Sequence, residues 1–299
     1  MALSDGQVPD ALPSPYLFNH AMVGIPWSGR PAAPGLALVD DPDLGALRVY
    51  DPTLPDSSPQ DIDPLLEGGA ALVAHRGASH LLRLPGSPAA DNVLVRELEL
   101  KLAPDGSSHL SARIRASGAM RLLYTDEQGE RFRPERLREN VYERLSDLLP
   151  EVRGLEVDAF SDDPDGRWTF GFRASSPALL ATFGALGALE LGPLLDLEQL
   201  PAPAPDSDEP AHLPMLGIIR EVWTIEHEGL RSVGISAPLG VANDHGHVRV
   251  VTHREPERTR IEREVGFGAL EVAPERRDQV LALRAALRKA NSVAAIFEP

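Results

Sequence analysis

The stretch LVRELELKL at residues 94–102 and the stretch LSARIRA at residues 110–116 decide the fold class of this chain. In the first stretch leucines alternate with valine and charged residues, and only Arg96 interrupts the apolar set. In the second, Leu, Ala and Ile alternate with Ser and Arg. Because successive side chains of a strand point to opposite faces, each stretch predicts a strand with one buried face.

The turn between these strands is predicted at PDGSS, residues 104–108, which makes the two stretches a hairpin. If Leu102 lies opposite Leu110, Glu99 faces Arg113 and Glu97 faces Arg115. Such cross-strand ion pairs each contribute about 0.2–1 kcal/mol to the register. The charged residues of the hairpin therefore have a structural explanation.

Outward from the hairpin, proline and glycine divide the chain into short segments that suit strands and turns. Apolar runs predict strands at residues 16–25, 47–50, 71–75, 80–84, 155–159, 168–172, 217–227, 230–236 and 247–253. Spacing of three or four residues between apolar side chains predicts amphipathic helices at 134–150 and 274–290. The expected fold is mainly β with a few helices (α+β), in an antiparallel, β-sandwich-like arrangement that closes with a C-terminal helix.

Composition excludes several classes of function. The formal charge is −16, which argues against a protein that binds nucleic-acid backbones. There is no cysteine, so the chain has no disulfides, thiolate metal ligands or thiol nucleophiles. No glycine-rich phosphate loop occurs, and no apolar run is long enough for a membrane span. The start of the sequence lacks the features of a signal peptide, so a cytoplasmic location is the default expectation.

Histidines and aspartates offer two weak metal patterns. His245, His247 and His253 could supply three imidazoles for zinc, although residues 243–246 also form an ordinary turn sequence before a strand. Asp61 and Asp63 lack the ligand spacing of a calcium loop. The turn and surface interpretations are favoured in both cases, so no metal or cofactor is predicted.

Two segments in the first 53 residues carry a resemblance: FNHAMV at 18–23 and LRVYDPT at 47–53. Together with the lead-in LPSPYLFNH at 12–20, they resemble the histidine and aspartate segments of the bacterial transglutaminase-like superfamily. Within it, the chain is most similar to the proteins with an extra domain of unknown function before the papain-like core and a β-rich region after it.

The resemblance implies a Cys, His, Asp triad in which His20 is the general base and Asp51 orients its imidazole. The cysteine would belong to a helix upstream of these residues, either in a longer gene product or in another protein. The resemblance also implies an exported or envelope setting for full-length relatives. Without the nucleophile, His20 as a strand histidine and Asp51 as a turn residue before proline are favoured over catalysis in this chain.

The resemblance divides the chain into residues 1–65, a partial core with the His and Asp segments, and two β-rich segments at 66–205 and 206–299. Residues 200–210, rich in proline, are the predicted internal linker. The preferred function is a non-catalytic C-terminal portion of a transglutaminase-like protein that acts as a structural or binding module. The alternatives are an enzyme subunit completed by a cysteine from a separate polypeptide, and a stand-alone β-sandwich interaction protein.

Overall fold

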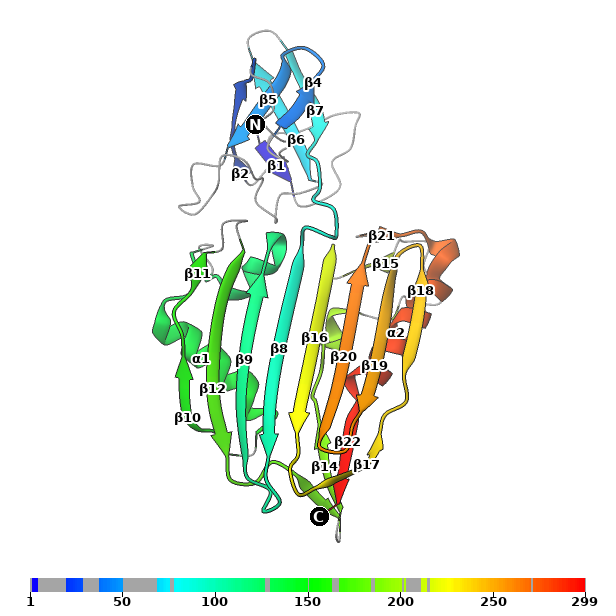
Figure 1. Cartoon of the computed structure of the whole chain (residues 1–299). Helices are drawn as coiled ribbons and strands as arrows, with labels where there is room; N and C mark the ends of the chain where they lie inside the picture. Colours follow the sequence, from blue (N-terminus) through cyan, green and yellow to red (C-terminus); the bar gives the residue numbers. More distant parts are fainter. Residues whose placement is uncertain are drawn as a thin grey trace. The chain divides into compact units, whose positions relative to one another are not determined.

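The computed structural model describes residues 2–4, 20–28, 38–50, 69–75, 78–126, 130–149, 151–162, 167–183, 186–200, 202, 211–213, 216–269 and 271–298. The chain forms two compact units (Figure 1): residues 1–87 with 122–131, and residues 88–121 with 132–299. These bounds differ from the predicted divisions at 65 and 205, because strands from both sides of residue 205 pair in one sheet. The roles predicted for the three segments stay predictions.

Unit 1 contains two small sheets. One has the strand order β2-β1-β6-β7 and the other β3-β5-β4. Their bounds are β1 Ala2–Ser4, β2 His20–Ala21, β3 Val23–Pro26, β4 Leu38–Asp41, β5 Gly45–Tyr50, β6 Ala70–His75 and β7 Ala78–Arg83. Buried Met22, Val39, Val49, Ala71 and Leu84 form the core of the unit. The predicted hairpin at 71–75 and 80–84 is confirmed as β6 and β7.

Unit 2 is built on a nine-stranded sheet with the order β10-β12-β9-β8-β16-β20-β19-β18, to which β11 adds by pairing with β12. The bounds are β8 Val93–Leu102, β9 Ser108–Ala116, β10 Arg153–Val157, β11 Ser161–Asp162, β12 Trp168–Ser176, β16 Gly217–Glu226, β18 Leu239–Asn243, β19 Gly246–Arg254 and β20 Arg258–Phe267. Neighbours are antiparallel except at the centre, where β8 and β16 run parallel.

The predicted hairpin is confirmed as β8 and β9, but its register is two residues away from the expected one. Leu102 lies opposite Ser108, and Glu97 lies opposite Arg113. The short turn explains the difference: Gly106 adopts φ +83° and Asp105 accepts a hydrogen bond from the backbone N–H of Ser107 at 2.9 Å. The strands can therefore begin pairing immediately beside the turn.

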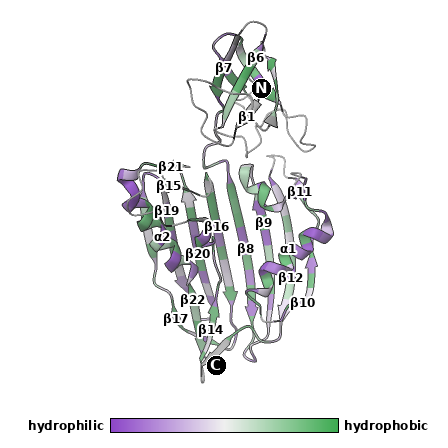
Figure 2. Cartoon of the chain, turned by 180° about the vertical axis from the view of Figure 1, so that it is seen from behind, coloured by the Kyte–Doolittle hydropathy of each residue, from purple (hydrophilic) through white to green (hydrophobic). Residues whose placement is uncertain are grey.

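Both α-helices pack on one face of this sheet, as Figure 2 shows from behind. Helix α1 (Pro134–Ser146) begins with proline in its first turn and buries Leu137, Val141 and Leu145. Helix α2 (Arg277–Asn291) follows the 3-10 turn η4 (Pro274–Arg276) and buries an apolar stripe of Val280, Leu283, Ala286, Leu287 and Ala290. The predicted helices at 134–150 and 274–290 are confirmed at these positions.

The remaining elements of the chain are short. A four-stranded sheet has the order β13-β14-β22-β17, and β15 pairs with β21. Their bounds are β13 Ala181–Phe183, β14 Leu186–Glu190, β15 Ala211–His212, β17 Arg231–Ile235, β21 Glu271–Val272 and β22 Ala294–Glu298, with 3-10 turns η2 Gly118–Tyr124 and η3 Leu197–Gln199. The predicted fold class, mainly β with helices that include one near the C-terminus, is confirmed.

Candidate functional site

The structure leaves the predicted pair of His20 and Asp51 untested. His20 lies in β2, where its backbone pairs with Leu3 of β1. Asp51 lies outside the described residues, as do Asp61 and Asp63. The proximity of His20 and Asp51 therefore stays a prediction.

A different histidine–aspartate pair lies in the described part of unit 1. Nε2 of His80, on β7, is 2.8 Å from Oδ2 of Asp41, at the end of β4. The Asp41 side chain is fully buried, and its Oδ1 accepts the backbone N–H groups of Asp43 and Leu44 at 2.9 Å each. The contact joins one small sheet of unit 1 to the other.

The hydrogen bonds explain why Asp41 stays ionised despite its burial. Burial raises the pKa of Asp41, but the backbone N–H groups of Leu44 and Asp43 and the imidazole of His80 together hold it below its ordinary value. Among the described residues, no hydroxyl side chain forms a hydrogen bond with His80. The geometry thus supports a link between two sheets rather than an activated nucleophile. The turn sequence DDPDLG at 40–45 is the signal that could have located this carboxylate.

The histidines of the weak zinc pattern do not converge. His247 on β19 contacts Oε1 of Glu264 through Nε2 at 2.9 Å, and the His253 side chain is exposed on the same face of the same strand. His245 lies in the turn before β19. In the part of the chain that the structure describes, no group of three His, Cys, Asp or Glu side chains could hold a metal ion.

The most extended feature of unit 2 is the sheet face opposite the helices, called here the open face. Strand residues that alternate with the buried ones make up this face, and most of them are exposed or half-buried. Its charged members are nine basic residues and six glutamates. They are Lys101, Arg113, Arg115, Arg153, Arg173, Arg220, Arg249, Arg258 and Arg260, with Glu97, Glu99, Glu156, Glu226, Glu262 and Glu264.

Ion pairs between neighbouring strands occupy much of the open face. Glu264 on β20 accepts a hydrogen bond from Nε of Arg220 on β16 at 2.6 Å and also contacts His247. Burial raises the pKa of Glu264, but Arg220 and His247 lower it overall. Arg115 donates to Glu97 at 2.8 Å, a pair that the sequence predicted although the two residues are diagonal rather than opposite.

Three basic side chains of the open face stand apart from these pairs. Arg113, Arg249 and Arg258 are exposed and form no side-chain hydrogen bond or ion pair with a described residue. Arg249 lies beside Glu264, but both oxygens of that carboxylate are already bonded. Their guanidinium groups are therefore available to an external acceptor.

Between Arg113 and Arg249 the open face is partly apolar. Val93 on β8 lies beside Ile218 on β16, whereas Val95 lies beside Arg220 and Val222 beside Glu97. All four aliphatic side chains are half-buried. These two strands form the parallel pair at the centre of the sheet. An aliphatic centre flanked by arginines and glutamates is the composition of a protein–protein contact surface, with an apolar middle and a charged rim.

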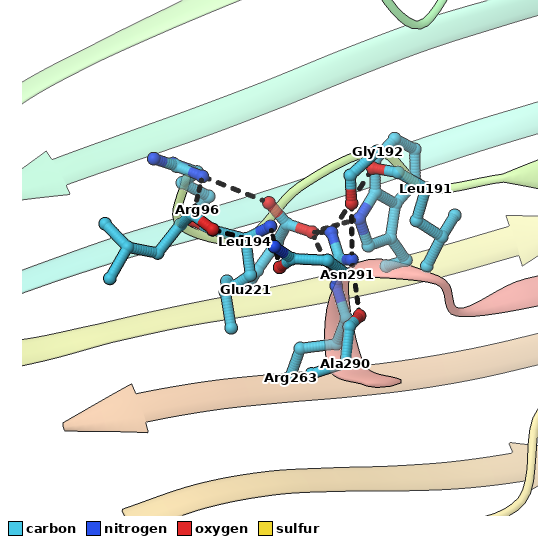
Figure 3. A network of polar contacts seen from close by, with 10 residues as sticks. Arg96, Leu191, Gly192, Leu194, Glu221, Arg263, Ala290 and Asn291 are labelled. Atoms are coloured by element: carbon cyan, nitrogen blue, oxygen red, sulfur yellow. Dashed lines mark hydrogen bonds and ion pairs between the residues drawn. The ribbon is translucent and has the colours of Figure 1, made fainter. Parts of the chain in front are cut away.

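The opposite, covered face holds a polar network (Figure 3) around Glu221 of β16. Arg263 of β20 is fully buried and donates Nε to Oε1 of Glu221 at 3.1 Å, while a second nitrogen, Nη2, bonds the same oxygen. Trp223 donates Nε1 to Oε1 at 2.6 Å, and Arg96 reaches Oε2 at 3.4 Å. Arg96, which interrupts the apolar alternation of the sequence, is thus a member of this network.

Arg263 also fixes neighbouring backbone groups. Its Nη1 donates to the carbonyl of Gly192 at 2.7 Å and to that of Ala290, in the last turn of α2, at 3.0 Å. Its Nη2 donates to the carbonyl of Leu191 at 3.2 Å. Burial raises the pKa of Glu221, but the charges of Arg263 and Arg96 and the hydrogen bonds bring it below its ordinary value. The network is enclosed and satisfied, so its role is to hold α2 and residues 191–195 to the sheet.

Comparisons with known proteins give little guidance. No protein-family model and no curated protein matches the chain. One similar solved structure is named "putative protease from Parabacteroides distasonis"; the match has 10% identity and a TM-score of 0.35, and covers 73% of this chain but 29% of that one. So low a TM-score supports no inference, and the transglutaminase-like expectation rests on residues 18–23 and 47–53. Within the described residues, no helix is long and apolar enough to cross a bilayer.

Proposed function

We propose that this chain is a non-catalytic binding module, the C-terminal portion of a transglutaminase-like protein, and that it binds a protein partner through the open face of unit 2. The observation that carries the binding role is the open face itself: an aliphatic centre on β8 and β16, with arginines on either side that have no partner among the described residues. The absence of cysteine supports the non-catalytic part, because a transglutaminase-like reaction requires a thiolate.

Site-specific photo-crosslinking tests the binding role. A benzoylphenylalanine at Thr224, on the open face near the end of β16, should form an adduct with one defined protein in an extract of the source organism. The same group at Arg138, exposed on α1, is the matched control on the other side of the sheet. Adduct formation should be suppressed by excess unlabelled chain. Equal adducts at both positions, or none at Thr224, would refute a binding role for the open face.

The triad ancestry has a separate test. If His20 and Asp51 are paired, the carboxylate raises the pKa of the imidazole above its usual value of about 6.5. NMR titration of the full chain should then show that Asp51→Asn lowers the pKa of His20 by about one unit while leaving His109 unchanged. His109 is the control because it is exposed and has no described partner. An unchanged His20 would remove the support for a transglutaminase-like pair.

A further inference from the structure

The open face is basic within an acidic chain. Its strands carry nine arginine or lysine residues against six glutamates, whereas the whole chain has a formal charge of −16. Cross-strand pairing alone would need equal numbers of the two signs. The excess includes Arg113, Arg249 and Arg258, whose side chains are all exposed and have no partner among the described residues.

The register fixes how far apart two of these arginines lie. Arg113 is on β9 and Arg249 is on β19, with β8, β16 and β20 between them. Four strand spacings of about 4.8 Å place the two strands about 19 Å apart. An extended segment rises about 3.3 Å per residue, so roughly six or seven residues cover that distance.

The side chains along this path alternate in chemistry. Glu97 lies beside Arg113 and Glu264 lies beside Arg249, but both carboxylates are already bonded to other side chains. Val95 on β8 and Val222 on β16 lie diagonal to one another between these two ends. Arginine presents a planar fork of donors that matches a carboxylate in a bidentate geometry. The surface is therefore complementary to a short segment with carboxylates at both ends and aliphatic side chains between them.

We infer that the partner of the open face presents an extended acidic–aliphatic–acidic protein segment of about seven residues, which lies across the strands from Arg113 to Arg249. This inference rests on the proposed binding function and names the chemistry of its partner. A nucleic acid fits less well, because a backbone with a phosphate at every nucleotide would also place charge over the aliphatic Val95 and Val222.

The test uses the full chain and the labelled heptapeptide Glu-Glu-Val-Ala-Val-Glu-Glu, with binding followed by fluorescence anisotropy. We expect saturable binding that weakens at least about tenfold in the double variant Arg113→Glu/Arg249→Glu and weakens as salt is raised. Neither arginine has a partner among the residues that the structure describes, so the variant breaks no described ion pair. The control Arg133→Glu/Arg138→Glu makes the same change of charge at exposed positions at the start of α1 and should bind like the unmodified chain.

Two further probes identify what the face recognises. A peptide with Gly-Ser-Gly in place of Val-Ala-Val should bind several-fold more weakly, because it loses the contact with Val95 and Val222. Tighter binding of inorganic polyphosphate than of the acidic peptide would overturn the inference in favour of a phosphoanion surface. Absence of peptide binding while Thr224 still forms its adduct would refute this inference and leave the binding function standing. Absence of both the peptide binding and the adduct would refute the inference and the binding function together.

Discussion

The two faces of the large sheet place the same residue types in opposite surroundings. Arg220 and Glu221 are consecutive on β16, and Arg263 and Glu264 are consecutive and antiparallel to them on β20. On the covered face Glu221 binds Arg263 in full burial, whereas on the open face Glu264 binds Arg220 beside solvent. The comparison separates ion pairs that hold the fold together from ion pairs that shape a surface.

The largest expected difference is between two carboxylates changed in the same way. Glu221→Gln leaves the buried charge of Arg263 without its counter-charge, and should lower the free energy of unfolding by about 3–5 kcal/mol. Glu264→Gln, on the open face, should lower it by about 1 kcal/mol or less. Urea unfolding of both variants measures this, with an unchanged m-value as the check on two-state behaviour. Equal losses would contradict the separation of the two faces.

Acid should destabilise the fold by protonating these two glutamates and Asp41. The folded-state pKa values of Asp41, Glu221 and Glu264 lie below their ordinary values of 3.8 for Asp and 4.5 for Glu. Each group therefore contributes stability that is present above its unfolded pKa and is lost as pH falls through its folded pKa, about 1.4 kcal/mol for each unit of lowering.

Chemical denaturation at a series of pH values between 6 and about 3 tests this sign. The free energy of unfolding should be level near pH 6 and fall below about pH 4.5, and Glu221→Gln should reduce the slope more than Glu264→Gln does. A free energy of unfolding that rises as pH falls from 4.5 to about 3 would contradict the lowered pKa values of these carboxylates.

A smaller effect is expected from a close approach on the open face. A Cβ at Gly266 would lie 2.5 Å from Cε1 of the His247 ring, whereas nothing lies within 4 Å of a Cβ at Gly268. Gly266→Ala should displace His247 from Glu264 and cost about 1 kcal/mol, while Gly268→Ala should be close to neutral. Thermal unfolding of the pair, with the NMR signals of His247, checks this; an unmoved His247 in Gly266→Ala would contradict it.

The smallest stability change is expected from the free arginines. Arg113→Ala removes a side chain with no described partner and should change the free energy of unfolding by less than about 0.5 kcal/mol. Arg115→Ala, on the same strand, removes the ion pair with Glu97 and should cost up to about 1 kcal/mol. Urea unfolding compares them, and a larger loss for Arg113→Ala would mean that it has a structural role.

Residues whose pattern is local were predictable from the sequence. The alternation at 94–102 and the helical spacing at 137–145 predicted β8 and α1 because burial repeats with the period of the element. The strand β20 was not predicted, because Arg263 stands at an inward position of its alternation. A buried arginine looks like a surface residue until its partner is known, and Glu221 lies 42 residues away.

The candidate surface was less predictable than the fold. The sequence shows that Arg113 and Arg249 are outward residues of their strands, but not that they lie on one face of one sheet. That follows from the pairing of β8 with β16, which brings together residues far apart in the chain. In contrast, the histidine and aspartate segments were singled out from short motifs, and that prediction awaits the titration of His20.

The parallel pairing of β8 and β16 also bears on the order of assembly. On either side of it the strands pair antiparallel within one part of the sequence: β8, β9, β12 and β10 between residues 93 and 176, and β16, β20, β19 and β18 between residues 217 and 267. Each of these pairings closes a shorter loop than the one that joins Leu102 to the strand beginning at Gly217. We expect the ladders on each side to form early and the pairing of β8 with β16 to form last. The open face spans that pairing, so it exists only once folding is complete.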